Sequence, residues 1–139
     1  MRIWIDTEFN DFKGELISMA LVAEDGSEFY ESLGCENPSP WVAVNVIPIV
    51  GKEPIHKNIF QIRLADFLAN FDQVHLIADW PEDIQHFCET LITGPGKRLD
   101  TPPLTMEIRR DLDATSLLPH NALADARAIM RKHLELEMA

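Results

Sequence analysis

Runs of hydrophobic residues near the start of the chain are short and end in polar residues. Residues 2–8 (RIWIDTE) are apolar on both faces before they reach two acids, which predicts a central strand. Residues 15–26 (ELISMALVAEDG) predict a second strand that ends in an Asp-Gly turn, and residues 27–32 predict a third. Because such turns join neighbouring antiparallel strands, we expect the first three strands to form a meander.

Helical and strand patterns alternate over the rest of the chain, after a proline-containing loop at residues 33–58. The predicted elements are a short helix at 41–46, a helix at 59–71, a strand at 74–79, a helix at 82–92, a strand at 104–111 and a final helix that starts near Asn121. This order predicts an α/β fold, a mixed five-stranded sheet that is antiparallel in strands 1–3, parallel afterwards and flanked by helices. A chain of 139 residues suits a single domain, 1–139.

Two predicted helices have an apolar face at helical spacing. In the helix at 59–71 the apolar positions are Ile59, Ile62, Leu64, Phe67, Leu68 and Phe71. In the final helix they are Leu123, Ala126, Met130 and Leu134. Pro81 suits the opening of the helix at 82–92, and we interpret Gly94-Pro95-Gly96 as its stop.

Asp6 and Glu8 end the first predicted strand. Side chains alternate along a strand, so the two carboxylates point to one face, with Cα atoms about 6–7 Å apart. Carboxylates at this spacing can converge on one hard cation or on a pair of cations. Taken alone, an Asp-x-Glu pair is more often the polar end of a strand that enters a loop.

His120 and Asp125 flank the start of the final predicted helix. Two residues five positions apart on one helix lie about 140° apart around its axis. The two side chains therefore share a face only if His120 precedes the helix. Asn121 is a suitable N-cap, which would place Asp125 in the first turn, where the helix dipole favours an anion. A dipole-compensating acid beside a loop histidine is the simpler interpretation of this pair on its own.

Acids also follow the strand at 74–79. Asp79 lies at the end of that strand, and Asp83 lies at the start of the next helix. Ligands bind outside the carboxyl ends of strands in such sheets, so either carboxylate can contribute to a site. Asp83 and Glu82 also suit a helix N-terminus for structural reasons alone.

These motifs together resemble the DEDDh exonucleases of the RNase H-like fold, over residues 3 to about 131. The resemblance rests on Asp6-x-Glu8, on a middle Asp at a strand-to-helix turn and above all on the segment HNALADARA, which starts at His120. The Ile-Asp-Thr-Glu-Phe and Ala-Asp-Trp-Pro-Glu-Asp segments are most similar to the compact bacterial and phage subgroup that includes RNase AS. Asp83 takes the place of the middle catalytic acid, and Asp79 stands where the family has Asn.

The resemblance implies a metal-dependent 3′–5′ exonuclease that releases nucleoside 5′-monophosphates. Asp6, Glu8, Asp83 and Asp125 would hold two divalent cations, Mg²⁺ or Mn²⁺, and His120 would act as the general base. Asp6 would contact both cations, with Glu8 and Asp125 on the side of the attacking water and Asp83 on the leaving-group side. Asp79 is expected to be an accessory or alternative middle acid.

Phe9 and Trp80 are the aromatic residues nearest to these motifs along the chain. Either can stack on bases of a single strand, and either can equally be a core residue. The net charge of −11 argues against a long, salt-dependent grip on nucleic acid, which needs many cationic side chains. We therefore expect a short contact with a single-stranded 3′ end, with RNA preferred over DNA by resemblance.

Two alternatives to an exoribonuclease remain at this point. One is a 3′–5′ DNA exonuclease with the same site, and the other is a non-catalytic RNase H-like module that binds a nucleic-acid end or a protein. No apolar run approaches the length of a membrane span or of a signal peptide, so we expect a cytoplasmic protein. The small size and the resemblance together favour a homodimer.

Overall fold

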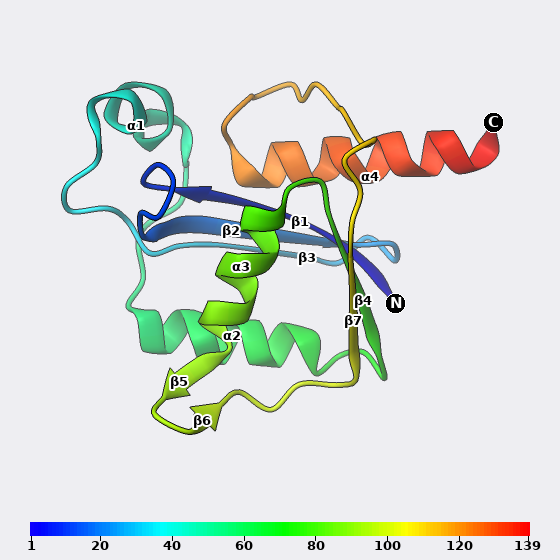
Figure 1. Ribbon diagram of the computed structural model, residues 1–139, viewed down its shortest axis with the longest axis horizontal. Coiled ribbons are helices and arrows are strands. Elements are labelled where there is room, and N and C mark those ends of the chain that lie inside the picture. Colours follow the sequence, from blue (N-terminus) through cyan, green and yellow to red (C-terminus); the bar gives the residue numbers. More distant parts are fainter.

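The structure is a computed structural model that describes residues 1–139, and it is built around one five-stranded sheet with the order β3-β2-β1-β4-β7 (Figure 1). The strands are β1 (Arg2–Phe9), β2 (Leu16–Ala23), β3 (Glu28–Ser32), β4 (Val74–Ala78) and β7 (Leu104–Ile108). The first three pair antiparallel, and β4 and β7 are added in parallel. The predicted mixed sheet is confirmed, including the central place of β1 and the antiparallel meander.

Helices cover both faces of this sheet. They are α1 (Pro40–Asn45), α2 (Lys57–Leu68), α3 (Pro81–Thr90) and α4 (Ala122–Met138), with a 3₁₀ turn η1 (Ile47–Ile49) after α1. In Figure 1, α4 lies along one face, and α2 and α3 lie on the other. This is an α/β fold consistent with an RNase H-like arrangement. None of its helices has the length and apolarity that crossing a membrane requires.

The larger core lies between the sheet and helices α2 and α3. Ile3 and Ile5 of β1 pack there with Phe60 and Leu64 of α2 and Phe87 of α3, all fully buried. Each such side chain contributes about 1.5–3 kcal/mol through burial, which fixes α2 and α3 against the sheet. The next residue on this face of β1 is Thr7, which follows Ile5 by the strand's period of two.

The opposite face of the sheet packs against α4. Trp4 and Ile77 are fully buried there against Ile129 of α4. The predicted apolar stripe of this helix is correct at Ala126 but incomplete, because Ile129 and His133 are buried whereas Met130 is only half-buried. Burial of His133 has a specific cause, since its Nδ1 accepts a 3.0 Å hydrogen bond from the Trp4 indole N–H.

The helix predicted at 59–71 differs in its bounds and in its buried face. Helix α2 starts two residues earlier and ends at Leu68. Ile59 and Ile62 are exposed, and Gln61 is buried in their place. The Gln61 amide donates to the carbonyls of Thr90, the last residue of α3, and of Ile92 just after that helix. These tertiary hydrogen bonds override the apolar pattern.

The segment after α3 contains a small hairpin that the sequence did not predict. Strands β5 (Ile92–Gly94) and β6 (Lys97–Arg98) pair antiparallel, and Gly96 has φ +68° in the turn between them. Pro followed by Gly at positive φ is typical of a tight turn. Helix α3 already ends at Thr90, so the segment predicted as its stop forms this hairpin turn instead. The strand predicted at 104–111 ends at Ile108.

Candidate functional site

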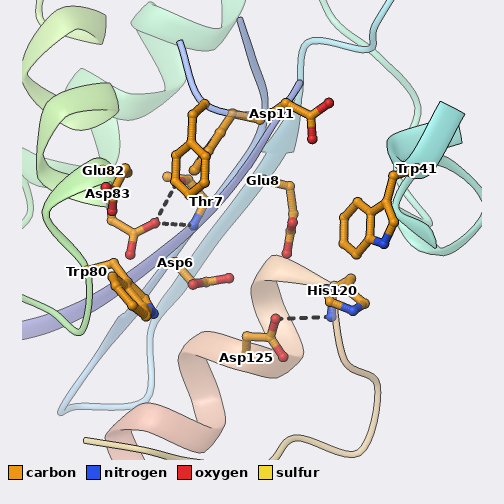
Figure 2. Close-up of a pocket in the computed structure, with 12 residues that line it drawn as sticks. Asp6, Thr7, Glu8, Asp11, Trp41, Trp80, Glu82, Asp83, His120 and Asp125 are labelled. Atoms are coloured by element: carbon orange, nitrogen blue, oxygen red, sulfur yellow. Dashed lines mark hydrogen bonds between the residues drawn. The ribbon is translucent and has the colours of Figure 1, made fainter. Parts of the chain in front are cut away.

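The acids of β1 stand where this strand extends beyond its parallel neighbour. The register pairs Trp4 with Ile77, and β4 ends at Ala78, so no strand flanks Asp6 and Glu8 on that side. The start of α3 occupies this place instead. Asp6 and Glu8 point to one side of β1, toward the first turn of α4 (Figure 2).

Two groups of three carboxylates converge at this point. In the first, Asp6, Glu8 and Asp125 each offer one oxygen, and these oxygens lie within 4.8 Å of one another. In the second, Asp6, Asp79 and Asp83 do the same. Asp6 belongs to both groups, so residues from β1, α4 and the β4–α3 connection meet at a single side chain.

Thr7 fixes the carboxylate of Asp83. The Thr7 backbone N–H and hydroxyl donate to Asp83 Oδ1, at 3.1 and 2.5 Å. Asp83 is almost completely buried, and its second oxygen, Oδ2, has no hydrogen-bond partner. Asp79 Oδ1 is likewise buried without a partner. Buried acceptors without partners are costly, so these oxygens are suited to a cation between them.

Burial and mutual repulsion raise the pKa values of the clustered acids. Burial, followed by the charges of Asp125 and Asp83, raises the pKa of Glu8 to about 8. Burial also raises the pKa of Asp83 to about 8, against the opposing effect of its hydrogen bonds from Thr7. For Asp6, burial and then the charges of Asp83 and Glu8 raise the pKa well above its ordinary value. Acids shifted in this way mark candidate functional sites.

The start of α4 has the geometry expected from the sequence. Asn121 is the N-cap, and its side chain accepts from the backbone N–H of Ala124 at 3.0 Å. His120 lies before the helix with φ +69°, a left-handed conformation that lets the chain turn over the Asp125 face. Asp125 Oδ2 accepts from the His120 backbone N–H at 3.2 Å, and Oδ1 accepts from the Ser116 hydroxyl at 2.5 Å.

A cavity of about 480 Å³ opens above the acids. It is lined by Asp6, Glu8, Asp83, His120 and Asp125 and by the two predicted aromatic residues, Phe9 and Trp80 (Figure 2). The structure therefore brings these seven predicted residues to one cavity. Asp79 lies beside it, because it belongs to the second carboxylate group but does not line the cavity wall.

The two predicted aromatic residues have different surroundings. Phe9 is half-buried and stacks on His86, with ring centroids 4.7 Å apart, so it is largely a packing residue. Trp80 is 50% exposed at the edge of the cavity. The guanidinium of Arg110 lies over its ring, 3.2 Å from the centroid, and so covers one face of the indole.

Phe12 and Trp41 also line the cavity, and the sequence did not single them out. Phe12 is 79% exposed, and Trp41 is 51% exposed beside the His120 ring, whose centroid is 5.0 Å away. Asn10 links the segments that carry them, because its side chain donates to the Asn37 carbonyl and accepts from the Ser39 backbone N–H. Their exposure next to a polar cavity identifies them in the structure, whereas their spacing along the chain gives no such signal.

The donor set fits divalent cations such as Mg²⁺ or Mn²⁺. All the converging ligand atoms are carboxylate oxygens, the ligands that these hard cations prefer. Two buried oxygens have no other partner, and burial, followed by the charges of neighbouring acids, raises the pKa values of Asp6 and Glu8. Bound cations would relieve both conditions. Each of the two groups that share Asp6 has ligand atoms close enough together to bind a metal ion.

Comparison with known proteins adds a second line of observation. No family model matches the chain. The chain is 32% identical over 153 residues to proteins named 3′-5′ exoribonuclease in two strains of Mycobacterium tuberculosis. The match covers 95% of this chain and 90% of each relative. It therefore extends over nearly the whole length of both sequences.

Proposed function

The chain belongs to the 3′-5′ exoribonuclease family that it matches over nearly its whole length, and on this premise we propose that it is a metal-dependent 3′–5′ exoribonuclease of the DEDDh type, similar to RNase AS. Its substrate is the 3′ end of single-stranded RNA, and its products are nucleoside 5′-monophosphates. The observation that carries the proposal is the pair of carboxylate groups that share Asp6 in a cavity beside His120.

The carboxylates divide into two roles in this proposal. Glu8 and Asp125, with Asp6, would hold a cation on the side of the attacking water, and Asp83, with Asp6, would hold a cation on the leaving-group side. Asp79 is an accessory ligand in the second group. The cations, when bound, supply acidification of the water and neutralisation of charge on the phosphate. Thr7 keeps Asp83 in place by donating two hydrogen bonds to Oδ1 of that carboxylate, and Oδ2 is left without a partner.

His120 is the general base of the proposed reaction. It lines the cavity together with Glu8 and Asp125, and its backbone N–H donates to Asp125, which supports a role on the attacking-water side. A ring nitrogen accepts the proton of the water as it attacks the phosphate, since an imidazole is a suitable base near neutral pH. The contact with Trp41 limits the orientations of the ring.

Aromatic side chains around the cavity favour a single-stranded substrate. Phe12, Trp41 and Trp80 are all at least half exposed there, and unpaired bases stack on such rings with little sequence preference. RNA is preferred over DNA in the proposal because the relatives are named exoribonucleases. A homodimer is also part of the proposal, to be checked by light scattering coupled to size-exclusion chromatography.

A single experiment tests the class of reaction, its polarity and the sugar preference. We expect 5′-labelled single-stranded RNA to be shortened stepwise from its 3′ end with Mg²⁺ or Mn²⁺ and to stay intact with EDTA. Single-stranded DNA and RNA duplexes should be degraded more slowly. Asp6→Asn should abolish the ladder, whereas Asp66→Asn, an exposed acid on α2, should leave it unchanged.

The possible results separate the proposal from its alternatives. A ladder with DNA alone would indicate a DNA exonuclease with the same site. Intact substrates under all conditions, together with no stabilisation by Mn²⁺ in a melting experiment, would indicate a non-catalytic binding module. Full hydrolysis by Asp6→Asn would contradict the proposed metal site.

A further inference from the structure

Arg110 is an exposed cation next to the carboxylate site, and its charge acts on the carboxylate of Asp79 without forming an ion pair with it. It follows β7, and it is absent from the ion pairs of the structure although the chain has 23 acidic residues. Its neighbour Arg109 is instead bound to Asp111 through two hydrogen bonds, of 2.8 and 2.7 Å. An unpaired guanidinium beside a group of acids is available for an anionic ligand.

Two contacts hold the Arg110 guanidinium in one place. It lies 3.2 Å from the centroid of the Trp80 ring, and its NH1 donates to the backbone carbonyl of Asp79 at 2.8 Å. Stacking on an aromatic face and a hydrogen bond to a fixed carbonyl orient the planar fork. The remaining N–H donors are left without a partner in the structure. The side chain is therefore pre-organised and still has donors to offer.

The position of Arg110 relates it to one side of the proposed reaction. Ala78 of β4 pairs with Ile108 of β7, so residues 79–80 and 109–110 leave the carboxyl ends of adjacent parallel strands together. That end of a sheet is where ligands bind in α/β folds. Asp79 belongs to the carboxylate group of Asp83, which the proposed function assigns to the leaving group.

We propose that Arg110 binds the phosphate on the 5′ side of the nucleotide that carries the leaving oxygen. This inference rests on the proposed function, which defines that side of the site. The guanidinium fork matches two phosphate oxygens, and Trp80 beneath it is exposed at the cavity edge, where the base of the same nucleotide can stack. Arg110 is then a substrate-binding residue, and a dinucleotide without a 5′-phosphate lacks the group that Arg110 would bind.

The test compares two RNA dinucleotides that differ only in a 5′-phosphate. The wild-type protein should cleave the phosphorylated dinucleotide with a kcat/KM about tenfold higher, the size expected for a hydrogen bond to a charged group. Arg110→Gln should remove this preference and cleave both at the wild-type rate for the unphosphorylated one. Its amide can still donate to the Asp79 carbonyl, and the side chain is exposed, so we expect the fold to persist.

Arg109→Gln is the matched control, because it removes the same charge from the adjacent position and should keep the tenfold preference. A preference retained in Arg110→Gln, or absent from the wild type, would overturn the inference while hydrolysis itself persists. No metal-dependent hydrolysis of any RNA would instead refute the proposed function.

A binding measurement supplies a readout apart from turnover. Anisotropy of a labelled oligoribonucleotide is followed in the Asp6→Asn background, which is expected to block hydrolysis. Loss of one phosphate contact in Arg110→Gln should reduce the slope of log K against log salt by about 0.7. An unchanged slope would count against the phosphate contact.

Discussion

At the scale of single residues, the site depends on side chains that hold the acids as much as on the acids. Thr7 stands between Asp6 and Glu8 but points to the other side of β1, where it meets Asp83. The hydrogen bonds to Oδ1 leave only Oδ2 of Asp83 to face Asp6 and Asp79. The identity of the middle residue in the Asp-Thr-Glu segment thus controls an acid from another element.

Replacing Thr7 by Val tests this dependence. Val keeps the shape and the backbone donor but lacks the hydroxyl, so Asp83 loses one of its two bonds. Partners of metal ligands typically affect affinity or activity by 10–100-fold, and we expect about a tenfold higher Mn²⁺ concentration for half-maximal hydrolysis. Thr7→Ser should restore the wild-type value. A Val variant with unchanged Mn²⁺ dependence would show that the backbone bond suffices.

His120 requires a substitution that respects its backbone. Its φ of +69° disfavours most side chains, but Asn tolerates this conformation better than other residues do. We expect His120→Asn to lower kcat by about 10²–10⁴-fold, the usual contribution of a general base, without changing stabilisation by Mn²⁺. His56→Asn is a suitable control, because Asn is also a good N-cap for α2. Unchanged turnover would remove His120 from the mechanism.

At the scale of elements, the sequence predicted most of what comes from local patterns. Alternation and turn residues identified the strands and the place of Asp6 and Glu8 on one side of β1. The N-cap at Asn121 placed His120 ahead of α4. The stated family resemblance was needed to choose Asp83 over Asp79, and the structure places both acids in one group with Asp6.

What the sequence missed depends on contacts between distant segments. Gln61 is buried because of carbonyls at the end of α3 and just after it, and His133 is buried because of the Trp4 indole. Apolar periodicity has no signal for either. Phe12 and Trp41 reach the cavity because Asn10 joins their two segments, a link that spacing along the chain does not reveal.

At the scale of the whole molecule, we expect the site to make stability depend on pH and on cations. The folded protein holds protons on Glu8 and Asp83 up to a pKa of about 8, whereas unfolded Glu and Asp release them at about 4.3 and 3.9. The stability linked to these raised pKa values is present below the unfolded values and is lost as the pH rises through about 8.

The expected result is a pH-dependent effect of metal on the melting temperature. In EDTA the melting temperature should decrease between pH 5.5 and 8.5. Mn²⁺ should raise it more at pH 8.5, where protons compete least with the cation for the carboxylates. The double variant Glu8→Gln, Asp83→Asn should weaken both effects. A Glu89→Gln control, at an exposed position on α3, should retain them. An equal Mn²⁺ shift at both pH values would contradict the linkage.

The meeting of β1 and α4 at the carboxylates also has a consequence for protein synthesis. Asp6 leaves the ribosome early, but Asp125 follows nearly all the residues that form the core. Until α4 has emerged and packed over Trp4, the group of Asp6, Glu8 and Asp125 is incomplete. The three carboxylates therefore come together only after α4 has folded onto the sheet, so this group is among the last parts of the molecule to form.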